Sequence, residues 1–102
     1  MDRQAMLKDI LAQNPSDAFA RYGLAMEYSN SGKTSEAISE FEALLKGHPD
    51  YTAGYFMAAQ TLSKANRTDE ARKMLQEGIA AAQRTGNEHA RSEMEGMLAD
   101  LG

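Results

Sequence analysis

Ser31-Gly32-Lys33-Thr34 is the part of the chain whose residue types come nearest to a phosphate-binding loop. In the complete motif, an earlier glycine and a preceding strand let backbone N–H groups surround the phosphates. Glu27 holds the place of that glycine, and the residues before the run follow a helical pattern rather than a strand pattern. We therefore interpret the run as a turn between two helices.

Histidines and carboxylates are present, but none has the spacing of a metal site or a catalytic pair. His48 and His89 lie far apart, and the chain contains no cysteine, which excludes zinc held by sulfur, disulfides and thiolate catalysis. Close carboxylates such as Glu36 and Glu40 are typical of the solvated face of an amphipathic helix. With no cofactor motif and no combination of nucleophile, base and orienting group, we predict a protein that is not an enzyme and binds no cofactor or metal.

Composition limits the classes of partner. The 102 residues fit a single domain, and the formal net charge of −4 comes from interspersed charges of both signs. No run of Lys or Arg supplies the positive patch that nucleic acid or an anionic membrane requires. Charged residues interrupt every apolar stretch before it reaches the length of a membrane span or of a secretory signal core. We expect a cytoplasmic protein that binds neither nucleic acid nor membrane.

A helical unit occurs twice in the chain, with a period of 34 residues. Residues before a proline avoid the helical region of backbone conformation, so Pro15 and Pro49 mark the ends of the preceding helices. Asp17 and Asp50 are then the candidate caps of the helices that follow. The positions that match under the shift are small residues and turn residues: Pro15/Pro49, Ala25/Ala59, Ser29/Ser63, Thr34/Thr68, Glu36/Glu70 and Ala37/Ala71.

Each unit contains two helices joined by a short turn. Gly32 in the first turn and Asn66 in the second are residue types that adopt the left-handed conformation at low steric cost, which ends a helix. Thr34 and Thr68 follow as the expected N-caps. Apolar stripes extend the pattern to both ends of the chain, so we expect six helices that pack antiparallel to their neighbours, over residues 2–13, 17–31, 34–47, 51–64, 68–84 and 87–101.

This pattern resembles the tetratricopeptide repeat, a unit of two helices whose small residues lie where the helices cross. The resemblance implies an all-α fold, a right-handed α-α superhelix of about six antiparallel helices. Arg21 departs from the family pattern, which has an aromatic residue there, and Gln83 replaces the final proline, so we expect a longer fifth helix. The residues that carry the resemblance are Leu24, Ala25, Tyr28, Ala37, Phe41 and Pro49 in one unit, and Tyr55, Ala58, Ala59, Leu62, Ala71 and Leu75 in the other.

On this basis the chain is expected to form one domain, residues 1–102. Residues 1–14 form an N-terminal half-unit helix, residues 15–48 the first repeat, residues 49–85 the second repeat and residues 86–102 a C-terminal capping helix.

The resemblance also implies a concave groove lined by the first helix of each unit. Some relatives clamp the terminal carboxylate of a peptide there with Lys, Asn and Arg. The matching positions in this chain hold apolar, aromatic or amide residues, so that clamp is absent and the groove suits an apolar peptide or helix of a protein partner. Helical spacing selects the residues expected to face the groove: Phe19, Tyr22, Met26, Ser29, Ala53, Phe56, Met57, Gln60 and Lys64.

Two alternatives remain open. The last helix either covers the groove of the second unit or leaves it open. The same helix and the aromatic groove also form a self-complementary apolar patch, so the alternative function is a structural module that forms homodimers or larger homo-oligomers. The residues of the last helix that bear on both alternatives are Met94, Met97, Leu98 and Leu101.

Overall fold

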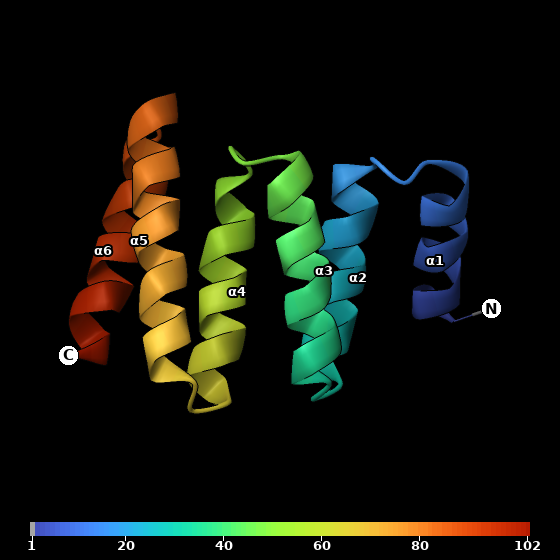
Figure 1. The fold of residues 1–102 in the computed structure, drawn as a ribbon, viewed down its shortest axis with the longest axis horizontal. Helices are drawn as coiled ribbons and strands as arrows, with labels where there is room; N and C mark the ends of the chain where they lie inside the picture. Colours follow the sequence, from blue (N-terminus) through green and yellow to red (C-terminus); the bar gives the residue numbers. More distant parts are fainter. Residues whose placement is uncertain (1) are drawn as a thin grey trace.

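The computed structural model describes residues 2–102, which form six α-helices that cross the molecule in chain order (Figure 1). The all-α fold is confirmed, and no helix boundary differs from the expected one by more than one residue. None of the described helices has the length and apolar character needed to cross a membrane. The helices are α1 Arg3–Gln13, α2 Ala18–Asn30, α3 Thr34–Gly47, α4 Thr52–Lys64, α5 Thr68–Thr85 and α6 Glu88–Leu101.

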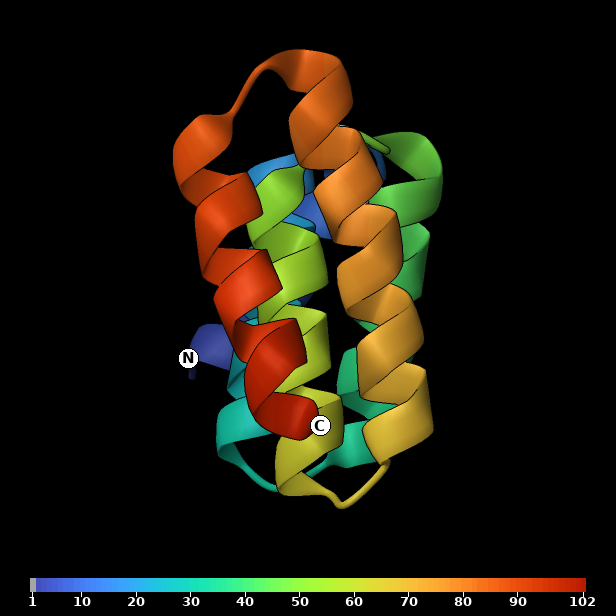
Figure 2. The same ribbon diagram turned by 90° about the vertical axis from the view of Figure 1, so that its left-hand side faces the viewer.

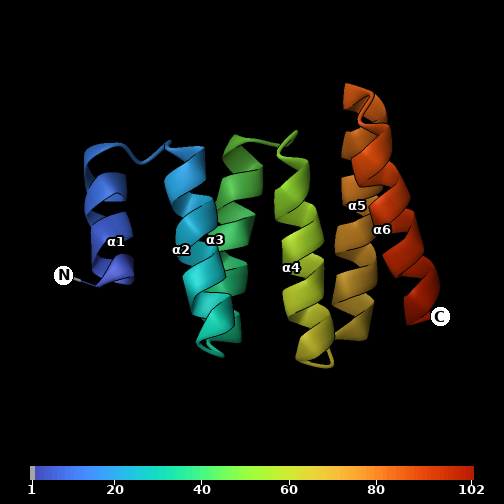
Figure 3. The same ribbon diagram turned by 180° about the vertical axis from the view of Figure 1, so that it is seen from behind.

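The helices form two layers. Seen along the stack, α4 and α6 lie on one side and α3 and α5 on the other (Figure 2). From behind, α2 and α6 lie in front of α3 and α5 (Figure 3). Contacts also join α2 to α4 and α4 to α6. The first helices of successive units therefore share one face of the molecule, with α6 as the third member of that row.

Small residues allow the two helices of each unit to approach closely, as expected. Ala25 and Ala37 are fully buried in the first unit, and Ala59 and Ala71 are fully buried in the second. One core cluster joins these alanines to Phe41, Leu44, Leu62, Leu75 and Met94, and a smaller cluster joins α1 to α2.

The turns inside the two units are closed by left-handed residues. The φ angle is 75° at Gly32 and 62° at Asn66, so the helix-ending role expected for both residues is confirmed. After the first left-handed residue, the N–H of Lys33 donates a hydrogen bond of 2.9 Å to the carbonyl of Tyr28, and the second turn repeats this bond.

The expected N-caps are correct at Asp17 and wrong at Thr34 and Thr68. The Asp17 carboxylate accepts a hydrogen bond of 2.9 Å from the backbone N–H of Ala20. Thr34 and Thr68 are instead the first helical residues of α3 and α5. The backward bond that closes each turn shortens the connection between the helices. The carbonyls of Lys33 and Arg67, the residues before the two threonines, therefore accept the first helical hydrogen bonds. Lys33 and Arg67 take the N-cap positions, and neither makes a side-chain cap bond.

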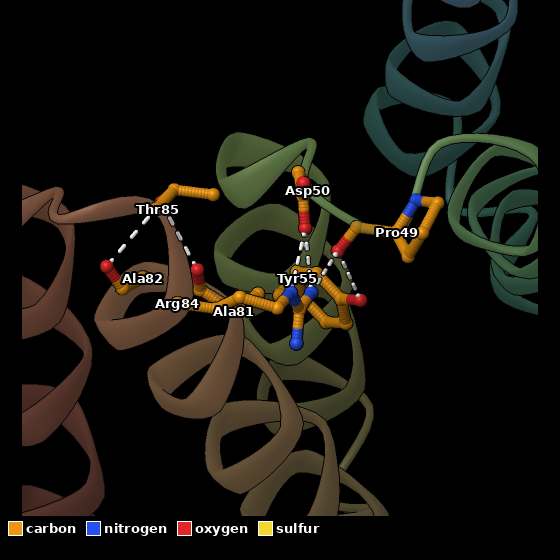
Figure 4. A network of polar contacts seen from close by, with 7 residues as sticks. All are labelled: Pro49, Asp50, Tyr55, Ala81, Ala82, Arg84 and Thr85. Carbon is orange, nitrogen blue, oxygen red and sulfur yellow. Dashed lines mark hydrogen bonds and ion pairs between the residues drawn. The ribbon is translucent and has the colours of Figure 1, made fainter.

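Asp50 was the other expected cap, and it does not cap α4, which begins without a side-chain cap bond. Its carboxylate accepts a hydrogen bond of 2.6 Å from Arg84, near the end of α5 (Figure 4). Arg84 also donates to the carbonyl of Pro49 at 3.2 Å, and the Tyr55 hydroxyl donates to the same carbonyl at 2.7 Å. This network fastens the turn before α4 to α5.

The greater length of α5 makes that network reachable. α5 has 18 residues and α3 has 14, which confirms the longer helix expected from Gln83 in place of proline. The helix ends at Gly86, where φ is 70°. The additional turn carries Arg84 to the level of Asp50.

Arg21 departs from the family pattern but makes the same hydrogen bond as Tyr55, the residue at the equivalent position of the second unit. Its guanidinium donates to the carbonyl of Pro15 at 3.1 Å, as Tyr55, 34 residues later, donates to that of Pro49. It also forms an ion pair of 2.7 Å with Glu40, and both side chains are largely buried. A cation thus replaces the aromatic residue while the fastening of the turn is retained.

Candidate functional site

The first-helix face carries an open pocket of about 260 Å³ between α4 and α6. Tyr22 of α2 closes one side, Phe56 and Met57 of α4 form a wall, and Ala90 of α6 faces them. The complete lining is Tyr22, Thr52, Ala53, Phe56, Met57, Asn87, His89, Ala90, Glu93 and Met94. Its position matches the expected groove, and its surface is mostly apolar and aromatic.

Aromatic packing fixes the wall formed by Tyr22. Its ring lies 5.5 Å from the ring of Tyr51 and meets the ring of Phe41 edge-on at 6.3 Å. Burial, and to a smaller extent the neighbouring Tyr51, raise the pKa of the Tyr22 hydroxyl above its ordinary value. Phe56 and Met57 are half-buried and pack against the core. The ring of Tyr22 is therefore held in place by its aromatic neighbours.

A second, smaller pocket lies at the opposite end of α2 and α4. Here Ser29 and Lys64 line a depression of about 170 Å³. The Thr61 hydroxyl donates to the carbonyl of Met57, so the bond of 2.8 Å between the Ser29 and Thr61 hydroxyls has Ser29 as its donor. Ser29 links α2 to α4, and Lys64 is left exposed.

The structure separates the nine residues expected to face the groove into three groups. Tyr22, Ala53, Phe56 and Met57 line the pocket between α4 and α6, while Ser29 and Lys64 line the smaller one. The remaining three residues line neither: Phe19 is 73% exposed on α2, Met26 is half-buried against the core, and Gln60 is half-buried on α4.

Five residues of α6 and its cap complete the pocket, and of these only Met94 was expected from the sequence to bear on the groove, as a residue that could cover it. The other four were missed because the groove was expected to be lined only by the first helix of each of the two repeats. A usable signal was present, since α6 begins 36 residues after α4, close to the 34 residues that separate the starts of α4 and α2. The five residues are Asn87, His89, Ala90, Glu93 and Met94.

The apolar side of α6 faces the core, which answers whether this helix covers the groove. Met94 is fully buried, and Met97, Leu98 and Leu101 pack partly buried against the core cluster. Met94 is part of the pocket lining, whereas Met97, Leu98 and Leu101 are not, and the pocket remains open beside Ala90 and Glu93. α6 therefore forms a wall of the groove.

A larger pocket of about 410 Å³ lies between the second helices α3 and α5. Ile38, Leu45 and Met74 give it an apolar centre. Its rim carries charges of both signs close together, from Glu42, Lys46, Glu70, Lys73 and Glu77. Among residues 2–102, no group of three or more His, Asp or Glu side chains is close enough to hold a metal ion.

Comparison with known proteins identifies the repeat. A family model described as tetratricopeptide repeat matches residues 29–92. A curated relative, the TPR repeat-containing protein PA0015 of Pseudomonas aeruginosa, is 27% identical over 95 residues, which cover 93% of this chain and 90% of the relative.

Two solved structures illustrate the likeness in three dimensions. The tetratricopeptide repeat domain protein of Salinibacter ruber is 31% identical, with a TM-score of 0.79, over 86% of this chain and 89% of that chain. PcrH, solved in complex with the chaperone binding region of PopD, is 17% identical, with a TM-score of 0.87, over 96% of this chain and 74% of that chain. At that identity the likeness to PcrH concerns the fold.

Proposed function

Because the chain belongs to the tetratricopeptide repeat family, we propose that it is a non-enzymatic protein-interaction scaffold that binds an apolar peptide or helix in its short concave groove. The observation that carries the proposal is the open pocket between α4 and α6, whose aromatic and apolar walls include Tyr22, Phe56 and Met57. Buried aromatic anchors of this type dominate the binding energy of many protein interfaces. The structure of PcrH with a segment of PopD supports the proposal, because a stack of this fold holds part of another protein there.

The proposed binding residues are eight of the nine expected from the sequence to face the groove. Phe19, Tyr22, Met26 and Ser29 contribute from α2, and Phe56, Met57, Gln60 and Lys64 contribute from α4. We also retain as proposals the division into a half-unit, two repeats and a capping helix, and a cytoplasmic setting, which suits a chain without cysteine.

Affinity capture with matched variants tests the groove. Phe56→Ala removes a pocket wall, while Met74→Ala removes a half-buried apolar side chain from the pocket between α3 and α5. Partners captured from native lysate by the wild type are quantified on each variant, after circular dichroism has shown that each variant is folded. We expect Phe56→Ala to lose most of the captured partner and Met74→Ala to retain it. Equal capture by both variants and the wild type refutes the groove assignment.

Self-association is the second candidate. It was expected through the groove and the last helix, whereas the observation that favours it lies on α1 and α2. Met6, Ile10 and Phe19 are the large hydrophobic side chains exposed in residues 2–102, at 48%, 41% and 73%, and all three belong to α1 or α2. Exposed apolar side chains of this kind mark contact surfaces when they adjoin one another. Light scattering over a concentration series tests this candidate. If the chain forms homo-oligomers, the measured mass rises with concentration. The mass should be lower for the double variant Met6→Ser, Ile10→Ser. A constant monomer mass removes this candidate.

A further inference from the structure

The pocket between α4 and α6 contains one carboxylate among mostly apolar and aromatic walls. Glu93 lines it together with Phe56, Met57 and Ala90. Throughout residues 2–102, the one ion-pair partner of Glu93 is the imidazole of His89, at 3.3 Å. The nearest arginine along α6, Arg91, is already bonded to Glu88 at 2.6 Å. Glu93 is thus a carboxylate without a cationic Lys or Arg partner.

The size of the pocket limits its occupant to a part of a ligand. Its volume of about 260 Å³ lies below the range of roughly 300–1,000 Å³ found for pockets that enclose a whole small molecule. One long side chain of a polypeptide is the group that this volume suits. Apolar walls with a carboxylate at the rim favour a side chain that has an apolar stem and a cationic end.

We propose that the partner inserts an arginine side chain into this pocket, with its stem along Phe56 and Met57 and its guanidinium on the Glu93 carboxylate. This inference rests on the proposed function and specifies the partner of the same groove. Arginine fits better than lysine because its planar guanidinium bonds a carboxylate with two N–H groups, stacks on aromatic rings and is weakly hydrated. The rings of Tyr22 and Phe56 provide such faces.

Electrostatics and span support this choice of partner. A purely apolar anchor would cover Glu93, which is 51% exposed, and remove water from it without supplying a compensating charge. The net charge of −4 attracts a cationic segment at long range. Adjacent helices lie about 8–10 Å apart, so an extended segment that rises about 3.3 Å per residue crosses from α2 to α6 in roughly six residues. The partner is therefore a short segment in which arginine adjoins apolar residues.

Selection from a random peptide library tests the inference without knowledge of the natural partner. Phage-displayed random decapeptides are selected on the immobilised wild type, on Phe56→Asp, on Glu93→Gln and on Glu95→Gln. Glu95→Gln is the matched control, because Glu95 lies on α6 outside the pocket and its ion-pair partner is Arg91. We expect arginine beside apolar residues in peptides from the wild type and from Glu95→Gln. Arginine should be absent, and apolar residues retained, in peptides from Glu93→Gln.

A direct affinity measurement follows with one selected peptide. Its arginine is replaced by citrulline, a neutral side chain of nearly the same shape, and binding is measured by fluorescence polarisation. We expect roughly tenfold weaker binding to the wild type, as for the loss of a charge-assisted bond, and little change on Glu93→Gln.

The outcomes separate the two proposals. Selected peptides that need Phe56 but contain no arginine, or equal citrulline effects on wild type and Glu93→Gln, overturn the arginine inference and leave the groove function standing. Selection that yields no peptide dependent on Phe56 overturns the groove function and the inference together.

Discussion

Gly78 lies where α5 crosses both α4 and α6, and Gly78→Ala tests that crossing. A Cβ atom placed on Gly78 would lie 2.5 Å from Met94 Sδ and 2.6 Å from Tyr55 Cβ. Non-bonded carbons are normally about 3.5–4.0 Å apart, so the overlap with Tyr55 is about 1 Å. Met94 is flexible, but the Cβ of Tyr55 is fixed to the backbone of α4. The two helices must therefore separate.

The expected cost follows from two opposing effects. Overpacking of this kind costs about 1–3 kcal/mol in a well-packed core. Alanine in a helix is more favourable than glycine by about 1 kcal/mol, which offsets part of that cost. We expect Gly78→Ala to lower the free energy of unfolding by up to about 2 kcal/mol, which lowers Tm by up to roughly 15 °C in a domain of this size.

Gly96→Ala provides the matched control on α6. A Cβ atom at Gly96 would have no neighbour within 4 Å, so the helix gains alanine without a clash. We expect Tm to rise by a few degrees, since the gain is about 0.5–1 kcal/mol. Thermal unfolding of both variants is followed by circular dichroism. If both substitutions raise Tm alike, the packing of α5 between α4 and α6 described above is wrong.

Three further expectations concern stability. Ala37→Arg or Ala71→Arg should each cost more than about 2 kcal/mol, because both alanines are fully buried between helices; unchanged urea unfolding would contradict the repeat packing. Burial raises the pKa of Tyr55 above 10.0, so this hydroxyl ionises at a lower pH in the unfolded chain than in the folded protein. The free energy of unfolding should therefore fall as the pH rises past about 10. Urea unfolding at several pH values should show a smaller fall for Tyr55→Phe than for the wild type, and an equal fall would refute this role of Tyr55. Arg84→Ala should lower Tm slightly at low salt and have little effect at about 1 M salt, because the ion pair with Asp50 is exposed; a loss that salt does not reduce would contradict an electrostatic role.

The sequence predicted the helices and their order because local rules determine both. Pro15 and Pro49 end the helices before them. Gly32 and Asn66 each follow a helix and take the left-handed conformation there. The buried alanines then fix which faces meet. These features act over a few residues and are visible without knowledge of the fold.

The cap positions and the groove depend on contacts between distant parts of the chain. Asp50 has the residue type of an N-cap, but Arg84 of α5 takes its carboxylate. The 36-residue spacing between the starts of α4 and α6 indicates that α6 joins the row of first helices, but only the packing of α6 shows that Ala90 and Glu93 line the pocket.

Site-specific photo-crosslinking tests the central claim, that the face formed by α2, α4 and α6 binds a protein segment. A photoreactive amino acid is placed at Ala53, an exposed residue of the pocket, and separately at Ala80, an exposed residue of α5 outside the described pockets. We predict that Ala53 yields a discrete adduct with a partner, that the adduct disappears when Phe56→Ala is added, and that Ala80 yields none. Adducts of equal yield from both positions, or an Ala53 adduct that persists with Phe56→Ala, would contradict the account.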